Sequence, residues 1–162
     1  MNELVRVKIA DYAVLKGQGV IITVGLGSCV GIVLYDKRNK VGGLAHILLA
    51  DSNNFNSRGN GFNPFKFADT AVPMLIEEME KYGGTKGRME AKVAGGSQLF
   101  NYNKTGEGIG AKNIQKVCEV LNEKGIHISG KDVGGNYGRT MQLFVDSGKV
   151  LISTVGKEEK EI

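Results

Sequence analysis

The sequence predicts a mixed α/β domain with much antiparallel sheet, and three observations predict it. Apolar runs of strand length, rich in β-branched residues, recur along the 162 residues. Two stretches carry apolar residues at helical spacing. The chain holds 24 glycines against 2 prolines, and glycine pairs stand at the ends of apolar runs, which indicates many tight turns. The length and the absence of a linker favour a single domain over residues 1–162.

Alternating or continuously apolar segments bounded by turn-forming residues mark seven or eight strands. They lie at residues 5–9, 20–24, 29–35, 41–49, 89–94, 126–133, 141–145 and 150–155. The turn-forming sequence at 146–149 joins the last two as a hairpin. The charged tail over 157–161 is expected to fray.

Two amphipathic helices complete the expected set. The first begins at Asn63, an N-cap followed by a proline at the first helical position, and runs to about Tyr82 before a glycine pair. The second ends at Gly125. Its apolar face holds Ile114, Val117, Cys118 and Leu121.

Composition narrows the class of protein. Hydrophobic residues make up 41% and charged residues 23% of the chain, which is typical of a soluble globular domain. No apolar run approaches the roughly 20 residues that a membrane helix needs, and the N-terminus lacks a signal-peptide core. Two cysteines without framework spacing suit a reducing compartment, so we expect a cytoplasmic protein without membrane insertion. The net charge of +4 is spread along a chain without tryptophan, which argues against nucleic-acid binding.

One cysteine and one histidine stand out because they fall on adjacent strands of an expected hairpin. Cys29 lies in the run TVGLGSCVG at residues 23–31, and His46 follows 17 residues later. A thiol beside an imidazole is a nucleophile beside its base. Gly27 and its neighbouring glycines leave room for a substrate, and Ser28 with the local backbone N–H groups is a candidate donor to an oxyanion.

The turn of this hairpin decides whether the pair can meet. A two-residue turn at 37–38 places Cys29 directly opposite His46. A two-residue turn at 38–39, or a four-residue turn over 37–40, makes them diagonal neighbours on the same face, about 7–8 Å apart. A three-residue turn puts them on opposite faces unless a bulge restores the phase.

A purely structural role stays open at this point. A lone cysteine in an apolar strand is usually a core residue, and a lone histidine in a strand is usually a satisfied, partly buried one. Cys118, on the apolar face of its helix, is expected in the core, and His127 is expected to face solvent. The spacings among these four residues are not those of a zinc site, so no metal site is predicted.

Five segments together resemble the CheD family, the chemoreceptor glutamine deamidases of bacterial and archaeal chemotaxis. They are TVGLGSCV at 23–30, GLAHILL at 43–49, ADTAVP at 68–73, AKVAGG at 91–96 and DVGGNYGR at 132–139. They cover nearly the whole chain in the family's order and spacing. This chain departs from the family's pattern at two positions, neither of which is Cys29 or His46. Ala50 stands where a proline is common, and Ala94 stands where an aromatic residue is common.

The resemblance implies an enzyme, a protein-glutamine glutaminase of the cysteine hydrolase kind. It implies that selected receptor glutamines become glutamates with release of ammonia, through a triad of Cys29, His46 and Thr23 and without a metal or organic cofactor. The implied fold is a sandwich of mixed, largely antiparallel β-sheets flanked by helices, similar to the catalytic domains of deamidating toxins. The implied partners are the cytoplasmic helices of chemoreceptors and the CheC phosphatase. The departure at Ala94 would affect a partner surface, so it concerns CheC binding more than the chemistry.

A second reading comes from another class of protein. It is a non-catalytic adaptor that binds chemoreceptors or CheC and modulates signalling.

For the deamidase, the substrate glutamine is expected on a long receptor helix. The polar loops over 51–61 and 100–110 are expected to grip this helix, with Arg58 and Lys104 meeting its acidic side chains; the alternative is that these loops are only solvated.

Overall fold

The computed structural model describes residues 3–53, 61–99 and 108–162. Within these ranges the chain forms ten strands, two α-helices and two short 3₁₀ helices. The strands are Leu4–Val7 (β1), Asp11–Lys16 (β2), Val20–Leu26 (β3), Val30–Asp36 (β4), Val41–Ile47 (β5), Met89–Gly95 (β6), His127–Val133 (β7), Arg139–Phe144 (β8), Lys149–Ser153 (β9) and Lys160–Glu161 (β10). The helices are Pro64–Lys66 (η1), Ala68–Glu80 (α1), Lys86–Arg88 (η2) and Ile109–Glu123 (α2).

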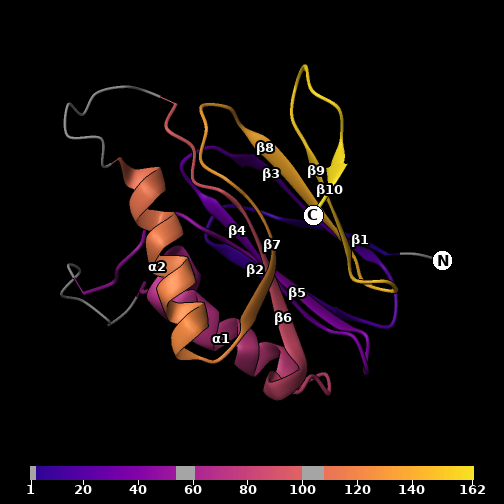
Figure 1. Ribbon diagram of the computed structural model, residues 1–162. Coiled ribbons are helices and arrows are strands. Elements are labelled where there is room, and N and C mark those ends of the chain that lie inside the picture. Colours follow the sequence, from indigo (N-terminus) through magenta and orange to yellow (C-terminus); the bar gives the residue numbers. More distant parts are fainter. Residues whose placement is uncertain (1–2, 54–60, 100–107) are drawn as a thin grey trace.

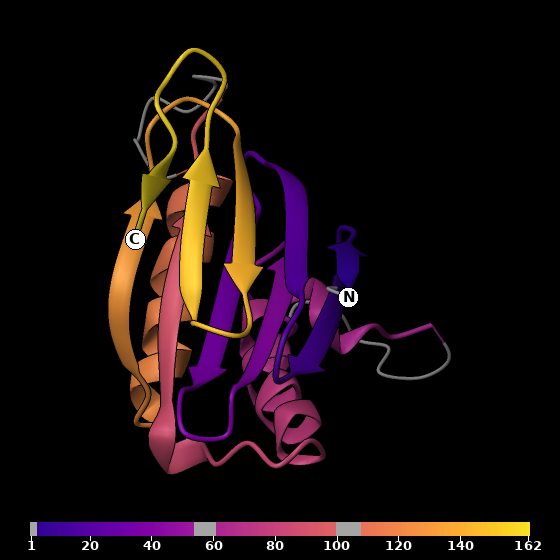
Figure 2. The same ribbon diagram turned by 90° about the vertical axis from the view of Figure 1, so that its right-hand side faces the viewer.

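The strands form two five-stranded sheets, which confirms a mixed α/β sandwich that is largely antiparallel. Sheet A has the order β1-β3-β8-β9-β10, and sheet B has the order β2-β5-β4-β6-β7. Among the strand pairs of the described residues, only β1–β3 and β6–β7 are parallel. Both helices lie on one side of sheet B, and sheet A covers its other side (Figure 1). Figure 2 shows the molecule from the side of sheet A, with the helices behind both sheets.

Alternation along β4 explains why the domain has three layers. Val30, Ile32 and Leu34 belong to the cluster packed against the helices, whereas Val33 belongs to the cluster between the two sheets. Because successive side chains of a strand point to opposite faces, an uninterrupted apolar strand must be covered on both sides. Any polar group on the inner face of sheet B is therefore enclosed between the sheets.

The first α-helix begins later than the sequence predicts. Asn63 does cap a helix, since its side chain accepts from the Phe65 N–H at 2.9 Å, but that helix is the single 3₁₀ turn η1. Phe67 then adopts an extended backbone and is 2% exposed, so burying its ring interrupts the helical path. α1 starts only at Ala68. α2 is followed by Gly125 at φ 72°, as the sequence predicts.

Three further predictions are corrected. β2 was not expected, because its residues are partly exposed on both faces and show no alternation. The tail does not fray: β10 pairs with β9, and Lys160 reaches Asp132 at 2.7 Å. Cys118 is partly exposed rather than in the core, because the buried stripe of α2 runs beside it. That stripe is Gly110, Asn113, Val117, Val120 and Leu121.

Neither α-helix in the described part of the chain combines the length and the apolar character that crossing a bilayer requires. The charged side chains expected to grip a receptor helix, Arg58 and Lys104, lie outside the described residues.

Candidate active site

The hairpin of β4 and β5 takes the four-residue turn, so Cys29 and His46 are diagonal neighbours. Gly31 pairs with His46 and Val30 with Ile47. Asp36 fixes this turn, because its carboxylate accepts from the Arg38 N–H at 3.0 Å and the Asn39 N–H at 3.3 Å. Cys29, directly before β4, packs in the cluster between the sheets and so shares the inner face with His46.

The ring of His46 is oriented from the opposite sheet. Thr23 Oγ1, on β3, lies 2.6 Å from His46 Nδ1 and 2.8 Å from the carbonyl oxygen of Val7. A carbonyl only accepts, so the single hydroxyl proton goes to Val7 and Thr23 must accept from Nδ1–H. This pattern assigns the Nδ1–H tautomer and leaves a lone pair on Nε2. The chain Val7–Thr23–His46 thus sets both the orientation of the ring and the nitrogen that can take a proton.

Burial keeps both reactive groups neutral. His46 is fully buried, and burial lowers its pKa from 6.5 to about 4. Burial raises the pKa of the Cys29 thiol, although a hydrogen bond from its own backbone N–H acts in the opposite direction. Nε2 has no hydrogen-bond partner among the described residues. Near pH 7 the two side chains are therefore a neutral thiol and a neutral imidazole.

A β-bulge precedes the cysteine. The β3–β8 register shifts between Thr23 and Leu26, and Gly25 in the bulge has φ 79°. The extra residue turns Leu26 inward, so both it and Thr23 face sheet B. Gly27 donates its N–H to Gly25 O at 3.0 Å, which removes it from the candidate oxyanion donors. Gly27 serves instead as a point of close approach, because Leu99 Cδ1 lies 2.9 Å from the position of an added Cβ.

The backbone N–H groups of Ser28 and Cys29 are the remaining donors beside the sulfur. Within the described part of the chain, Ser28 N–H has no protein acceptor, and the acceptor of Cys29 N–H is its own sulfur. The carbonyls on either side are held: Gly96 N–H donates to Cys29 O and Ser97 N–H to Gly27 O, each at 2.8 Å. Ser28 N–H lies in the same peptide plane as the held carbonyl of Gly27, so its direction is fixed.

A buried ionic network holds Ser97, the residue whose N–H donates to Gly27 O. Arg139 Nη1 donates to Ser97 Oγ at 2.8 Å, and Arg139 Nε donates to Asp132 at 2.9 Å. Ser97 Oγ in turn lies 2.6 Å from Tyr137 O and 3.2 Å from Gly134 O. Sequence reasoning quoted 132–139 only as a motif and assigned these residues no role. The available signal in the sequence was Arg139, a charged residue at the start of a strand of mostly apolar residues.

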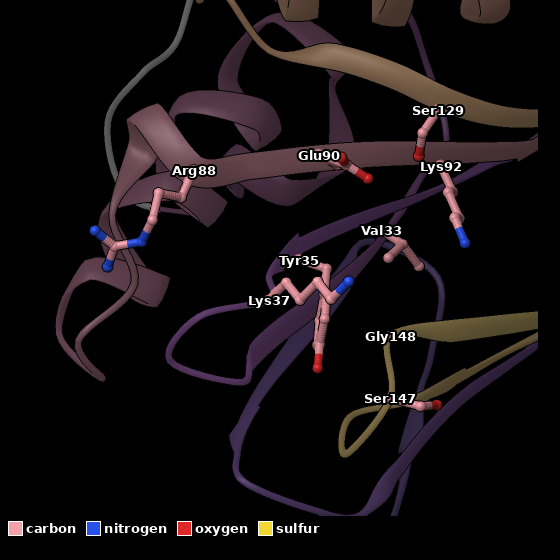
Figure 3. A pocket seen from close by; sticks show the side chains of 9 residues that line it. All are labelled: Val33, Tyr35, Lys37, Arg88, Glu90, Lys92, Ser129, Ser147 and Gly148. Carbon is pink, nitrogen blue, oxygen red and sulfur yellow. The ribbon is translucent and has the colours of Figure 1, made fainter.

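Two clefts help to locate the reactive end. One, of about 230 Å³, is drawn in Figure 3 and is lined by side chains of β4, β6 and β7 and by the turn at Ser147 and Gly148. Its lining residue on β4 nearest to Cys29 is Val33, about 13 Å along the strand. The other, of about 390 Å³, is lined by Gln98, Leu99, Gly135 and Asn136. Because Leu99 lies over Gly27, this second cleft adjoins the cysteine segment.

The other cysteine and histidine do not join the site. Cys118 is on α2, beyond the outer face of sheet B, and His127 is exposed on β7. Among the described residues, no group of three His, Cys, Asp or Glu side chains is arranged to hold a metal ion. The structure thus brings together Cys29, His46 and Thr23, with Ser28 beside them.

Comparisons with known proteins agree with one another. The family model described as CheD chemotactic sensory transduction matches residues 48–154. A relative from Clostridium novyi (strain NT), named probable chemoreceptor glutamine deamidase CheD, is 50% identical over 154 residues, covering 94% of this chain and 93% of its own. A relative of the same name from Desulforamulus reducens is 47% identical and covers 99% of this chain and 96% of its own. Another, from Clostridium botulinum (strain Alaska E43), is 49% identical over 96% and 95%. These alignments extend over the segment before residue 48, where the thiol, the imidazole and the threonine lie.

Proposed function

We propose that this chain, which belongs to the CheD family, deamidates glutamine side chains of chemoreceptors to glutamate and releases ammonia. The relatives' names support the substrate and the reaction. The observation that carries the chemistry is the buried imidazole of His46, which is oriented by Thr23, keeps a free lone pair on Nε2 and shares the inner face of sheet B with the Cys29 side chain. A nucleophile, a base and an orienting group are the parts that a cysteine hydrolase needs.

In the first half of the reaction Cys29 attacks the glutamine. Its thiol proton passes to His46 Nε2, and the sulfur adds to the side-chain carbonyl carbon of the substrate. The N–H groups of Ser28 and Cys29 donate to the oxyanion that forms. His46 then returns the proton to the nitrogen, the C–N bond breaks, and ammonia leaves a thioester on Cys29.

In the second half water replaces the sulfur. His46 Nε2 takes a proton from the water as its oxygen adds to the thioester carbonyl. The C–S bond breaks, the sulfur regains its proton, and the product is a glutamate side chain. Throughout, Thr23 holds the ring by accepting from Nδ1–H, so the same nitrogen gives and takes each proton.

The surface around the cleft beside Gly27 is suited to a protein substrate. Leu99 on its rim is 47% exposed, and Val24 in the nearby bulge is 55% exposed. Exposed apolar side chains at a reactive end are typical of a surface that meets another protein. We also propose that the protein works in the cytoplasm, where receptor helices are accessible, and that it binds the CheC phosphatase as a second partner.

The test is ammonia release and mass spectrometry on a receptor cytoplasmic fragment. The parent protein is expected to add about one dalton at specific glutamines, since NH₂ is replaced by OH. Cys29→Ala is expected to abolish both signals, and Cys118→Ala, at the other cysteine, to keep them. Full deamidation by Cys29→Ala would overturn the assignment of the nucleophile.

Two other results would change the functional class. Binding of the fragment without any mass change would favour the adaptor over the enzyme. Cleavage of the fragment's backbone would favour a protease. Co-purification with CheC from an organism that has it tests the second partner, and its absence would remove that part of the proposal alone.

A further inference from the structure

The β4–β5 ladder ends with His46 inside it and Cys29 just beyond it, and a side chain from α2 bridges the two segments past that end. The last paired residues are Val30 and Ile47. Beyond them, Asn113 Nδ2 donates to the carbonyl oxygens of Ser28 at 2.8 Å and Leu48 at 3.0 Å. Ser28 directly precedes Cys29, and Leu48 lies two residues after His46. One amide group therefore joins the two segments that carry the thiol and the imidazole.

The orientation of this amide is fixed by its neighbours. Turning it over would place Oδ1 against two carbonyl oxygens, which only accept, so Nδ2 must face them. Oδ1 is buried and has no partner within the described part of the chain. An unpaired buried acceptor costs free energy that an apolar residue at 113 would avoid. The amide at this position is therefore explained by its two donors.

Close packing of the helix places Asn113. Gly110, in the first turn of α2, approaches the backbone so closely that an added Cβ would lie 2.5 Å from the carbonyl oxygens of Gly96 and Ser97. Ile114 occupies the space that a side chain at Gly96 would need. Gly96 and Ser97 are the residues whose N–H groups hold Cys29 O and Gly27 O. The helix thus rests on the segment that holds the cysteine loop, and Asn113 is fully buried at this junction.

We infer that Asn113 is a positioning residue that sets the separation of Cys29 from His46 at the open end of the hairpin. The inference rests on the proposed function, because that separation matters for proton transfer from the thiol to Nε2. Without the two donors, the segments beyond Val30 and Ile47 have no shared hydrogen-bond partner among the described residues. A displacement of about 1 Å at a reacting pair can cost about 100-fold in rate.

The test compares Asn113→Leu and Asn113→Asp with a matched control, Asn122→Asp. Asn122 is exposed on the same helix, so the control makes the same chemical change away from the site. For both Asn113 variants, kcat for deamidation of a receptor fragment is expected to fall about 10- to 100-fold with KM changed less than about threefold. The control is expected to keep the parent values.

Alkylation gives a readout that does not depend on deamidase activity. The rate at which iodoacetamide modifies Cys29, followed by mass spectrometry to separate it from Cys118, is measured from pH 6 to 10. The rate at pH 7 is expected to fall about tenfold in both Asn113 variants, because the thiol has lost its base. Folded variants with kcat and alkylation rates within twofold of the parent would overturn the inference, even if their melting temperature is lower.

If both Asn113 variants fail to fold, the inference is tested on the parent protein by NMR. Capping Cys29 with iodoacetamide is expected to shift the Asn113 side-chain amide resonances in a ¹⁵N spectrum, and unshifted resonances would overturn the inference. Full deamidation by Cys29→Ala would instead contradict the proposed function, and the alkylation result would still stand by itself.

Discussion

Thr23 has one hydroxyl proton and two polar neighbours, Val7 O and His46 Nδ1. It can donate to only one of them, and this determines the tautomer of His46. Val7 O takes the proton at 2.8 Å, so the oxygen of Thr23 is left to accept from His46 Nδ1 at 2.6 Å. The lone pair of the imidazole is then confined to Nε2. A threonine can thus do for a histidine what a carboxylate does in other triads, without adding a buried charge.

Replacing Thr23 by valine tests this role at nearly constant volume. The change removes the acceptor for Nδ1–H and leaves the ring free to turn or to exchange tautomers. We expect kcat for ammonia release to fall about 10- to 100-fold, a part of what a general base contributes. Thr23→Ser keeps the hydroxyl and is expected to stay within about threefold of the parent. A valine variant at the parent rate would exclude the orienting role.

Burial of His46 also makes the free energy of unfolding depend on pH. Its pKa is about 4 in the folded state against 6.5 for an unperturbed histidine, so between these values the unfolded chain binds more protons. The stabilisation is complete above pH 6.5 and is lost as pH falls toward 4, by about 3 kcal/mol at most.

Urea unfolding at a series of pH values from 7 to 4 measures this slope. The parent is expected to lose stability more steeply than His46→Gln, which has no group to protonate at this position. His127→Gln removes the exposed histidine and is expected to keep the parent slope. Equal slopes in the parent and His46→Gln would show that the imidazole is not buried in its neutral form.

At the scale of the element, the loop before β4 is held by a turn that only glycine can form. Gly95 has φ 106°, and an added Cβ would collide with the carbonyl oxygen of Cys29. Gly95→Ala is therefore expected to lower the free energy of unfolding by about 1–3 kcal/mol and to reduce deamidation by moving the cysteine. Gly87 has open space around its Cα, so Gly87→Ala is the control and is expected to change neither. Urea unfolding and ammonia release check both variants; an unaffected Gly95→Ala would contradict the tight contact.

Elements with a regular pattern could be predicted from the sequence, and elements without one could not. The apolar strands β3 to β6 follow from their composition, and the end of α2 follows from Gly125. β2 lies at the edge of sheet B and is partly exposed throughout, so no periodicity marks it. β10 is held by backbone pairing and by the ion pair of Lys160 with Asp132, neither of which depends on an apolar pattern.

Part of the site could likewise be predicted from the sequence, and part could not. Spacing brought Cys29 and His46 to one hairpin but did not choose the turn, because residues 37–40 are all polar and suit several turn types. The carboxylate of Asp36, which caps the turn, made that choice. Thr23 belongs to the other sheet and entered the prediction only through the family resemblance. Asn113 was overlooked, although a polar residue on the buried stripe of a helix is a signal in itself.

At the scale of the whole molecule, one buried ionic cluster joins the two sheets. Arg139 on β8 of sheet A pairs with Asp132 on β7 of sheet B at 2.9 Å, and Lys160 on β10 reaches the same carboxylate at 2.7 Å. Burial alone would raise the pKa of Asp132, but the hydrogen bonds from Lys160 and Arg139 outweigh it and hold that pKa below its usual range. The side chains of Arg139 and Asp132 are buried, so their ion pair is screened little by solvent, whereas that of Lys160 is about half exposed.

Removing the central cation should therefore be costly. Arg139→Met leaves Asp132 with one partner and is expected to lower the free energy of unfolding by about 3–5 kcal/mol, measured in urea. Lys149 and Glu161 form an exposed pair at 3.8 Å, and Lys149→Met is expected to cost less than about 1 kcal/mol. Similar losses in the two variants would mean that the buried cluster contributes no more than a surface pair.

The division of the site between the two sheets has a consequence for the newly made chain. The hairpin with the thiol and the imidazole leaves the ribosome well before β8, the strand that pairs with β3 on the side away from β1. Until β8 arrives, the threonine strand has only β1 beside it, and a pair of strands is marginal by itself. Translation thus delivers the Cys29 thiol and the His46 imidazole early but leaves the ring of His46 unoriented until the two sheets pack together.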